Sequence, residues 1–93
     1  MYRVIVLYAE EPEAASYAEH VEVCKRVPNG VFRYGKVTGA PMGEPAHAFY
    51  AEWEFADEEA FRKAVRSEEF MATGKDAYKR GFPMPSVEFA ELS

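Results

Sequence analysis

The chain alternates between hydrophobic patterns of strand-like and helix-like period. Residues 2–8, Tyr-Arg-Val-Ile-Val-Leu-Tyr, are rich in β-branched and aromatic side chains and predict a first strand. From Pro12 to about Val27 apolar residues recur at helical spacing, and Pro28-Asn29-Gly30 stops the predicted helix. The buried stripe that this spacing predicts consists of Ala14, Tyr17, Ala18, Val21 and Cys24.

The rest of the chain predicts three more strands and two more helices. The strands lie at residues 31–38, 47–55 and 87–92. A Gly- and Pro-rich loop at residues 39–45 separates the first two of them. Asp57 is a suitable N-cap for a second helix, whose buried face carries Phe61, Ala64 and Val65. Ser67 can cap a further short helix, which residues 81–85 break.

The order strand, helix, strand, strand, helix, strand predicts an α+β fold of the ferredoxin-like βαββαβ type. In this fold the first and third strands lie in the centre of a four-stranded antiparallel sheet, and the helices lie on one face. A chain of 93 residues has room for one hydrophobic core. We therefore expect a single domain over residues 1–93.

The first strand is apolar on both of its faces. Val4 and Val6 share one face, and Ile5 and Leu7 share the other. A sheet with one solvated face shows regular alternation of apolar and polar residues instead. Because an apolar outer face usually marks an interface, we expect a homodimer in which the helix-free faces of two sheets pack together. Charged residues are expected in the same contact, namely Glu52 and Glu54 with Arg3, Arg33 or Lys36 as counter-charges.

Composition and charge exclude several classes of function. The net charge is −5 and the basic residues are scattered, which argues against nucleic acid as a partner. No apolar run approaches the ~20 residues that span a bilayer, so no membrane association is expected. Cys24 is the single cysteine and cannot form an internal disulfide, which fits a reducing cytoplasm. The N-terminus shows no signal-peptide pattern, and we expect a cytoplasmic protein.

His20 is the main candidate for catalytic chemistry, since imidazole titrates near neutral pH. Tyr17 lies three residues earlier, so both polar tips are expected along one edge of the buried stripe. There they would face the aromatic side of the third strand, which carries Phe49 and Trp53. Two hypotheses stay open. His20 acts with these residues in a small-molecule pocket, as acid/base or hydrogen-bond donor, or it is a half-buried structural histidine.

Other residues and motifs give weaker indications of function. Cys24 lies in the apolar stripe with nothing nearby in sequence to activate its thiol, so we interpret it as a core residue. His20 and His47 lack a paired metal-ligand spacing, and no metal site is predicted. The loop at residues 39–43 lacks the Gly-Lys-Ser/Thr end of a phosphate loop. No motif indicates a cofactor.

Several segments carry a resemblance to a known family. Tyr17 and His20 on the first helix are followed by Arg26-Val27-Pro28 and then a glycine. The further matching segments are residues 33–34, 50–55, 57–61 and 67–70. In these residues, and over nearly its whole length, the chain resembles the EthD-like family of the dimeric α+β barrel superfamily. It departs from the family pattern at Glu22, where a proline is common, and at Asn29, which is inserted.

The resemblance implies a ferredoxin-like subunit that dimerises through its sheet, with a pocket between the sheet and the helices. The founding member is associated with bacterial degradation of an ether alongside an oxygenase system. Relatives in the superfamily include cofactor-free monooxygenases, isomerising or dehalogenating enzymes and haem-binding proteins, so the fold alone does not choose an activity.

Three functions remain open at this point. The first is an enzyme, such as a cofactor-free oxygenase or isomerase, that acts on a hydrophobic or aromatic molecule with His20 as its catalytic residue. The second is a non-catalytic ligand-binding or accessory protein of an oxygenase or degradation pathway, which uses the same pocket. The third is a purely structural dimer with a closed core.

Overall fold

The helices and strands follow the predicted order in a computed structural model that describes residues 1–93. Two helices connect the third strand to the fourth, as predicted. The strands are β1 (Tyr2–Tyr8), β2 (Val31–Lys36), β3 (Phe49–Phe55) and β4 (Ser86–Glu91). The helices are α1 (Ala14–Cys24), α2 (Glu58–Val65) and α3 (Glu68–Lys79). None of them has the length and apolar character that a membrane span requires.

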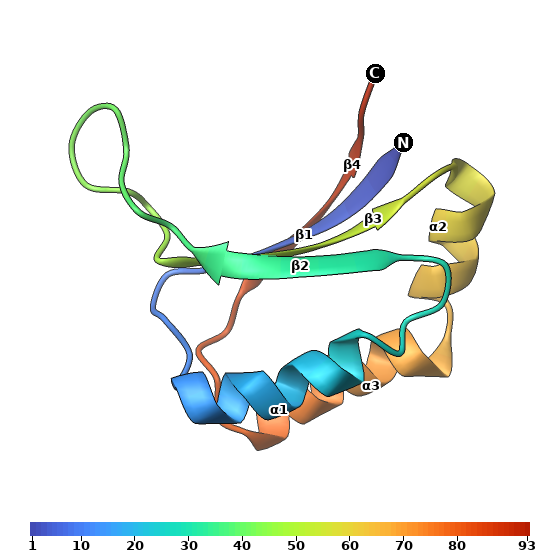
Figure 1. Cartoon of the computed structure of the whole chain (residues 1–93), viewed down its shortest axis with the longest axis horizontal. Coiled ribbons are helices and arrows are strands. Elements are labelled where there is room, and N and C mark those ends of the chain that lie inside the picture. The colour runs from blue at the N-terminus through green and yellow to red at the C-terminus, as the bar shows by residue number, and fades with distance from the viewer.

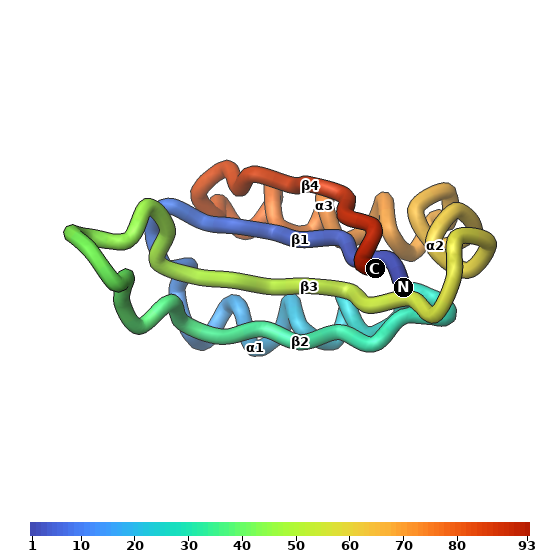
Figure 2. Tube along the Cα trace, turned by 90° about the horizontal axis from the view of Figure 1, so that it is seen from above, coloured from blue at the N-terminus to red at the C-terminus, as the bar shows by residue number.

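The four strands form one antiparallel sheet in the order β2-β3-β1-β4, so β1 and β3 are central, as predicted. Figure 1 shows α1 and α3 together on one face of this sheet, with α2 at one end. Seen from above, α1 runs along the β2 side and α3 along the β4 side (Figure 2). The opposite face carries no helix. The ferredoxin-like α+β fold is therefore confirmed.

α1 is shorter at both ends than predicted. The Glu13 side chain caps the helix by accepting two hydrogen bonds from main-chain N–H groups of the first turn. Pro12 therefore precedes the helix, which begins at Ala14. Beyond Cys24 the main-chain bonds tighten to three-residue spacing, so the helix ends there and not at Val27.

The buried face of α1 also differs from the predicted stripe. Its buried residues are Tyr17, His20, Val21 and Cys24. Ala14 and Ala18 are exposed, and His20 lies within the stripe, with only 4% of its surface accessible. The reason is α3, which packs beside α1 and covers the side that carries His20.

α3 is the longest helix of the chain, although the sequence pattern predicts a short one. Ser67 caps it as predicted, since its hydroxyl accepts a 3.1 Å hydrogen bond from the main-chain nitrogen of Phe70. The helix then continues for 12 residues to Lys79. Gly81 has a φ of 72°, a left-handed conformation that ends a helix and suits glycine.

Strand ends differ from the predicted ranges by one or two residues. β2 stops at Lys36, β3 starts at Phe49, and β4 covers Ser86–Glu91. The β2–β3 hairpin still continues one step further, because the main-chain nitrogen of Val37 donates to the oxygen of Ala48 at 2.9 Å. The intervening loop projects beyond the sheet (Figure 1).

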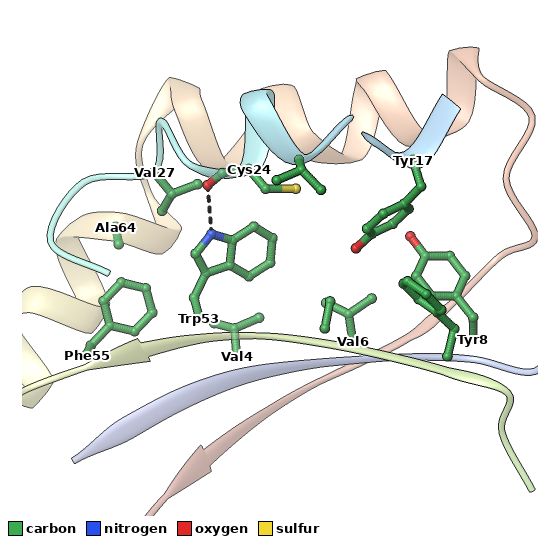
Figure 3. Close-up of a cluster of buried hydrophobic side chains, with 12 residues drawn as sticks. Val4, Val6, Tyr8, Tyr17, Cys24, Val27, Trp53, Phe55 and Ala64 are labelled. Carbon is green, nitrogen blue, oxygen red and sulfur yellow. Dashed lines mark hydrogen bonds between the residues drawn. The ribbon is translucent and has the colours of Figure 1, made fainter. Parts of the chain in front are cut away.

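The core lies between the sheet and the helices (Figure 3). Its largest fully buried side chains are Tyr8, Phe55, Val4 and Cys24. Burying a side chain of the size of Val or Phe contributes roughly 1.5–3 kcal/mol, so this layer dominates the stability of the fold. At Gly30 a Cβ would lie 2.7 Å from the ring of Phe55, so any side chain there would force this ring or the backbone to shift.

The helix-free face carries an ion-pair cluster. Glu52 is 5% exposed although it points away from the helices. Its carboxylate pairs with Arg33 and, at 3.6 Å, with Arg3, and it accepts a hydrogen bond from the hydroxyl of Tyr50. Glu54 pairs with both arginines as well. Two of the three predicted counter-charges therefore pair with these glutamates, whereas Lys36 pairs with Glu11 instead.

Candidate functional site

A cavity of about 320 Å³ lies between the inner face of the sheet and the helices. Ten of its 14 lining residues are hydrophobic, and none carries a formal charge apart from a histidine that can be protonated. Such a lining favours an apolar ligand held by few polar groups. In Figure 3, Tyr17 and Cys24 project from α1 towards the sheet, and Trp53 projects from β3 towards α1. The lining includes Tyr17, His20, Cys24, Phe32, Trp53 and Phe70.

His20 is the only ionisable base in this lining, and α3 holds it in place. Its Nδ1 lies 2.7 Å from Oδ2 of Asp76. Aromatic neighbours restrict the ring, including Tyr17 and, edge-on at a centroid distance of 5.3 Å, Phe82. The imidazole is therefore fixed by one strong polar contact and by packing, which is the condition for a directional hydrogen bond to a ligand.

Arg80 connects this pair to α1. Its Nε donates to Oδ2 of Asp76 at 2.8 Å, the same oxygen that His20 contacts. Its Nη1 donates to Glu19 at 2.7 Å and to the hydroxyl of Ser16 at 3.1 Å. Asp76 and Arg80 lie four residues apart at the end of α3, so the two helices are joined by this network beside the cavity.

The network sets the proton positions. Burial tends to raise the pKa of the Asp76 carboxyl, but hydrogen bonds from Arg80 and His20 outweigh it and hold that pKa below its ordinary value. Asp76 is therefore ionised at neutral pH and can only accept hydrogen bonds. It follows that Nδ1 of His20 carries a proton. In the neutral ring Nε2 is then the acceptor, and it has no partner within the chain.

Tyr17 is 3% exposed and separates the cavity from the far end of the core. Its ring packs against Phe49 with centroids 4.8 Å apart and meets Tyr8 edge-on. Burial strongly raises the pKa of the Tyr17 phenol, and burial raises the pKa of Tyr8 to about 12. Both hydroxyls are protonated at neutral pH, so Tyr17 offers the cavity a hydrogen-bond donor.

Cys24 lines the cavity from α1 but remains a thiol. Burial, assisted by the negative charge of Asp76, raises the pKa of the Cys24 thiol to about 12. The thiolate is the reactive form of cysteine, so this residue is a poor nucleophile at neutral pH. Its position in the buried core agrees with the interpretation as a packing residue.

The structure brings together three of the four predicted ligand-binding residues. Tyr17, His20 and Trp53 line the same cavity. Phe49 does not reach it, because the ring of Tyr17 stands between them, and Phe49 instead lines a smaller hollow of about 230 Å³ between α1 and β2. No group of three or more His, Cys, Asp and Glu side chains is arranged to hold a metal ion.

Asp76 and Arg80 are site residues that the sequence pattern does not predict. Their spacing of four residues with opposite charge is a recognisable helix pair, but it is usually solvent-exposed and structural. Nothing in the sequence relates Asp76 to His20, which lies 56 residues away. Only the packing of α3 against α1 brings them into contact.

No family model matches the chain, and no curated protein matches it either. Solved structures do match. An ethyl tert-butyl ether D (EthD) family protein from Bacillus halodurans shares 26% sequence identity with this chain. The match covers 100% of this chain and 99% of the other, with a TM-score of 0.79.

Two further structures share the fold at lower identity. A dimeric ferredoxin-like protein of unknown function from Jannaschia has 14% identity and a TM-score of 0.72, with 98% of each chain covered. SnoaB, a cofactor-independent oxygenase from Streptomyces nogalater, has 16% identity and a TM-score of 0.58, with 98% of this chain and 90% of that chain covered. At such identities the likeness is one of fold.

Proposed function

Because this chain resembles the EthD-like proteins of the dimeric α+β barrel superfamily in sequence and fold, we propose that it binds a hydrophobic or aromatic small molecule. Residues 1–93 act as one domain of a cytoplasmic homodimer. The ligand occupies the cavity between α1 and the sheet, in contact with Tyr17, His20 and Trp53.

The observation that carries this proposal is the composition of the cavity wall. A wall of mostly apolar side chains surrounds two polar groups on α1, the donor of Tyr17 and the imidazole of His20. Small-molecule sites have this form, with apolar surface for affinity and few polar groups for orientation. A volume of about 320 Å³ is at the lower end of the range for such sites, which suits a compact ligand.

Two activities are consistent with this site. The contact between His20 and Asp76 favours an enzyme, since the carboxylate holds the imidazole in one orientation, as an acid–base residue requires. The neutral state of the other polar lining groups favours a second candidate, a non-catalytic binding or accessory protein, because Tyr17 and Cys24 both hold their protons. Turnover assays with aromatic and ether substrates, comparing the unmodified protein with His20→Ala, separate the two candidates.

Homodimerisation is proposed through the helix-free face of the sheet. Ile5 and Leu7 are only partly covered there, and Val31 is 54% exposed. Nε of Arg3 is buried on this face without a hydrogen-bond partner, which is a costly arrangement in a monomer. The similar ferredoxin-like protein from Jannaschia is dimeric, which supports the same assembly.

Binding can be tested with a neutral probe and the single tryptophan. Trp53 lines the cavity and supplies the one indole N–H signal in a nitrogen–proton correlation spectrum. We expect 2-methoxynaphthalene to shift that signal saturably and to give a matching calorimetric isotherm. Native mass spectrometry of freshly purified protein complements this titration, because it detects a co-purifying molecule.

Gly74 offers a matched pair of variants for this test. It lines the cavity from α3, and a Cβ placed on it meets nothing within 4 Å. Gly74→Leu should fill part of the cavity and weaken binding, whereas Gly74→Ala should leave binding intact. A Trp53 signal that neither 2-methoxynaphthalene nor its hydroxyl analogue 2-naphthol shifts in the unmodified protein, at concentrations up to their solubility, would contradict the proposed function.

A further inference from the structure

The hydrogen bonds around His20 determine which of its ring nitrogens can accept a hydrogen bond from a molecule in the cavity. Oδ2 of Asp76 accepts from both His20 and Arg80, so the carboxylate is ionised and Nδ1 of His20 is the donor. Nε2 is the ring nitrogen without a partner, and it is not among the fully buried atoms. Since the ring lines the cavity, Nε2 is the acceptor that His20 can offer to a bound molecule.

We propose that His20, oriented by Asp76 and Arg80, selects ligands that carry an aromatic hydroxyl group, whose O–H donates a hydrogen bond to Nε2. This inference rests on the proposed function, because it names the ligand class of the same cavity. His20 contacts the ligand, whereas Asp76 and Arg80 are positioning residues that fix the imidazole tautomer from outside the lining.

The remaining lining explains why the ligand is neutral and not an ionised aromatic molecule. No Lys, Arg, Asp or Glu side chain lines the cavity. A ligand carboxylate or ammonium group would lose its hydration there without gaining a counter-charge, which is strongly unfavourable. A hydroxyl group has a smaller desolvation cost, and Nε2 compensates for it with one hydrogen bond.

The aromatic part of the ligand is inferred from the rings around the cavity. Phe32 and Trp53 pack at a centroid distance of 5.0 Å, and Trp53 meets Phe70 edge-on at 5.5 Å. All three belong to the lining. Flat apolar surfaces of this kind stack favourably on another ring. Tyr17 also lines the cavity, and its hydroxyl group can donate a hydrogen bond to the ligand oxygen.

The test compares 2-naphthol with 2-methoxynaphthalene, which replaces the O–H donor by a methyl ether. In calorimetric titrations at pH 8 the unmodified protein should bind 2-naphthol about tenfold or more tightly than the ether, as expected for one buried hydrogen bond. Asp76→Asn should reduce this preference for 2-naphthol to near parity. The asparagine amide can donate a hydrogen bond to Nδ1, so the ring proton moves to Nε2, which becomes a donor. Affinity for 2-methoxynaphthalene should stay within about twofold in this variant.

A matched control comes from α2. Glu58 pairs with Arg62 four residues later, as Asp76 pairs with Arg80, but neither residue of the α2 pair lines the cavity. Glu58→Gln should therefore keep the full preference for 2-naphthol over 2-methoxynaphthalene. Arg80→Ala is a second variant of the network, for use if Asp76→Asn folds poorly. It should lower the preference for 2-naphthol, although Arg80 does not contact the ligand.

The outcomes separate this inference from the proposed function. Equal affinity for the two probes in the unmodified protein overturns the inference but leaves the cavity as a ligand site. An undiminished preference in both Asp76→Asn and Arg80→Ala shows that these residues do not position His20, which also overturns it. Failure of both probes to bind overturns the proposed function and the inference together.

Discussion

The indole nitrogen of Trp53 donates a 2.9 Å hydrogen bond to the main-chain oxygen of Cys24, the last residue of α1. The same oxygen accepts a 3.3 Å hydrogen bond from the main-chain nitrogen of Val27, so the indole is its second donor and comes from the sheet. It also fixes the indole ring, which forms part of the cavity wall. A single side chain therefore joins β3, the end of α1 and the candidate site.

Replacing Trp53 with Phe should destabilise the protein by about 0.5–1.5 kcal/mol, because it removes the indole hydrogen bond and leaves the oxygen of Cys24 with only the 3.3 Å bond from the main-chain nitrogen of Val27. The cavity would also gain volume next to α1. Urea unfolding followed by circular dichroism measures this difference without relying on the tryptophan. A change of less than about 0.5 kcal/mol, the size of an ordinary surface substitution, would show that the hydrogen bond contributes little.

Gly30→Ala should cost about 1–3 kcal/mol, as expected for overpacking a tight contact. The added Cβ would lie 2.7 Å from the ring of Phe55, which is fully buried and cannot move away freely. Gly74→Ala is the control and should stabilise the protein by up to about 1 kcal/mol, since alanine favours a helix and nothing obstructs its methyl group. Thermal unfolding of the two variants should shift in opposite directions.

The thiol of Cys24 should react slowly with disulfide reagents in the folded protein and rapidly after denaturation. Burial raises its pKa to about 12, so the folded chain keeps a proton that the unfolded chain releases above the ordinary value of 9.0. The free energy of unfolding should therefore decrease as the pH rises from about 9 towards 12, by at most about 1.4 kcal/mol per pH unit from this group. Cys24→Ala should remove its share of the decrease. A thiol that reacts at the same rate with and without denaturant would contradict its burial.

Asp76 should make the protein sensitive to acid. Its pKa is lowered in the folded state, so it contributes stability that is present above its ordinary pKa of 3.8 and lost as the pH falls through its folded value. Asp76→Asn should be less stable than the unmodified protein at neutral pH, and the difference should shrink below about pH 4. Urea unfolding between pH 2 and 7 measures this. A difference that is independent of pH would mean that the carboxylate charge is not the stabilising feature.

Leu7→Glu should yield a monomer if the helix-free sheet face is the dimer interface. The substitution places a charge on that face, two residues from the partly buried Ile5 and opposite Tyr50. Met42→Glu is the control, because Met42 is 88% exposed in the loop beyond the sheet. Sedimentation velocity at micromolar concentration should give a dimer for the unmodified protein and for Met42→Glu. A monomeric unmodified protein would overturn the proposed assembly.

Local patterns in the sequence determined much of the fold. The first strand, the central position of β1 and β3, and the caps at Asp57 and Ser67 all agree with the structure. The strand and the caps depend on residues close together in sequence, such as a capping side chain and the N–H groups of the next turn. The resemblance to EthD-like proteins, also inferred from local motifs, is confirmed by the match to the Bacillus halodurans structure.

The length of α3, the burial of His20 and the exclusion of Phe49 from the cavity were decided by tertiary structure. Thr73 is the one buried residue of α3, so the helix depends on its packing beside α1. The contact between His20 and Asp76 spans 56 residues, and neither sequence neighbourhood specifies it. Periodicity identifies which side of a helix is buried, but the partner that meets each side chain depends on how separate elements pack, and that information is not local.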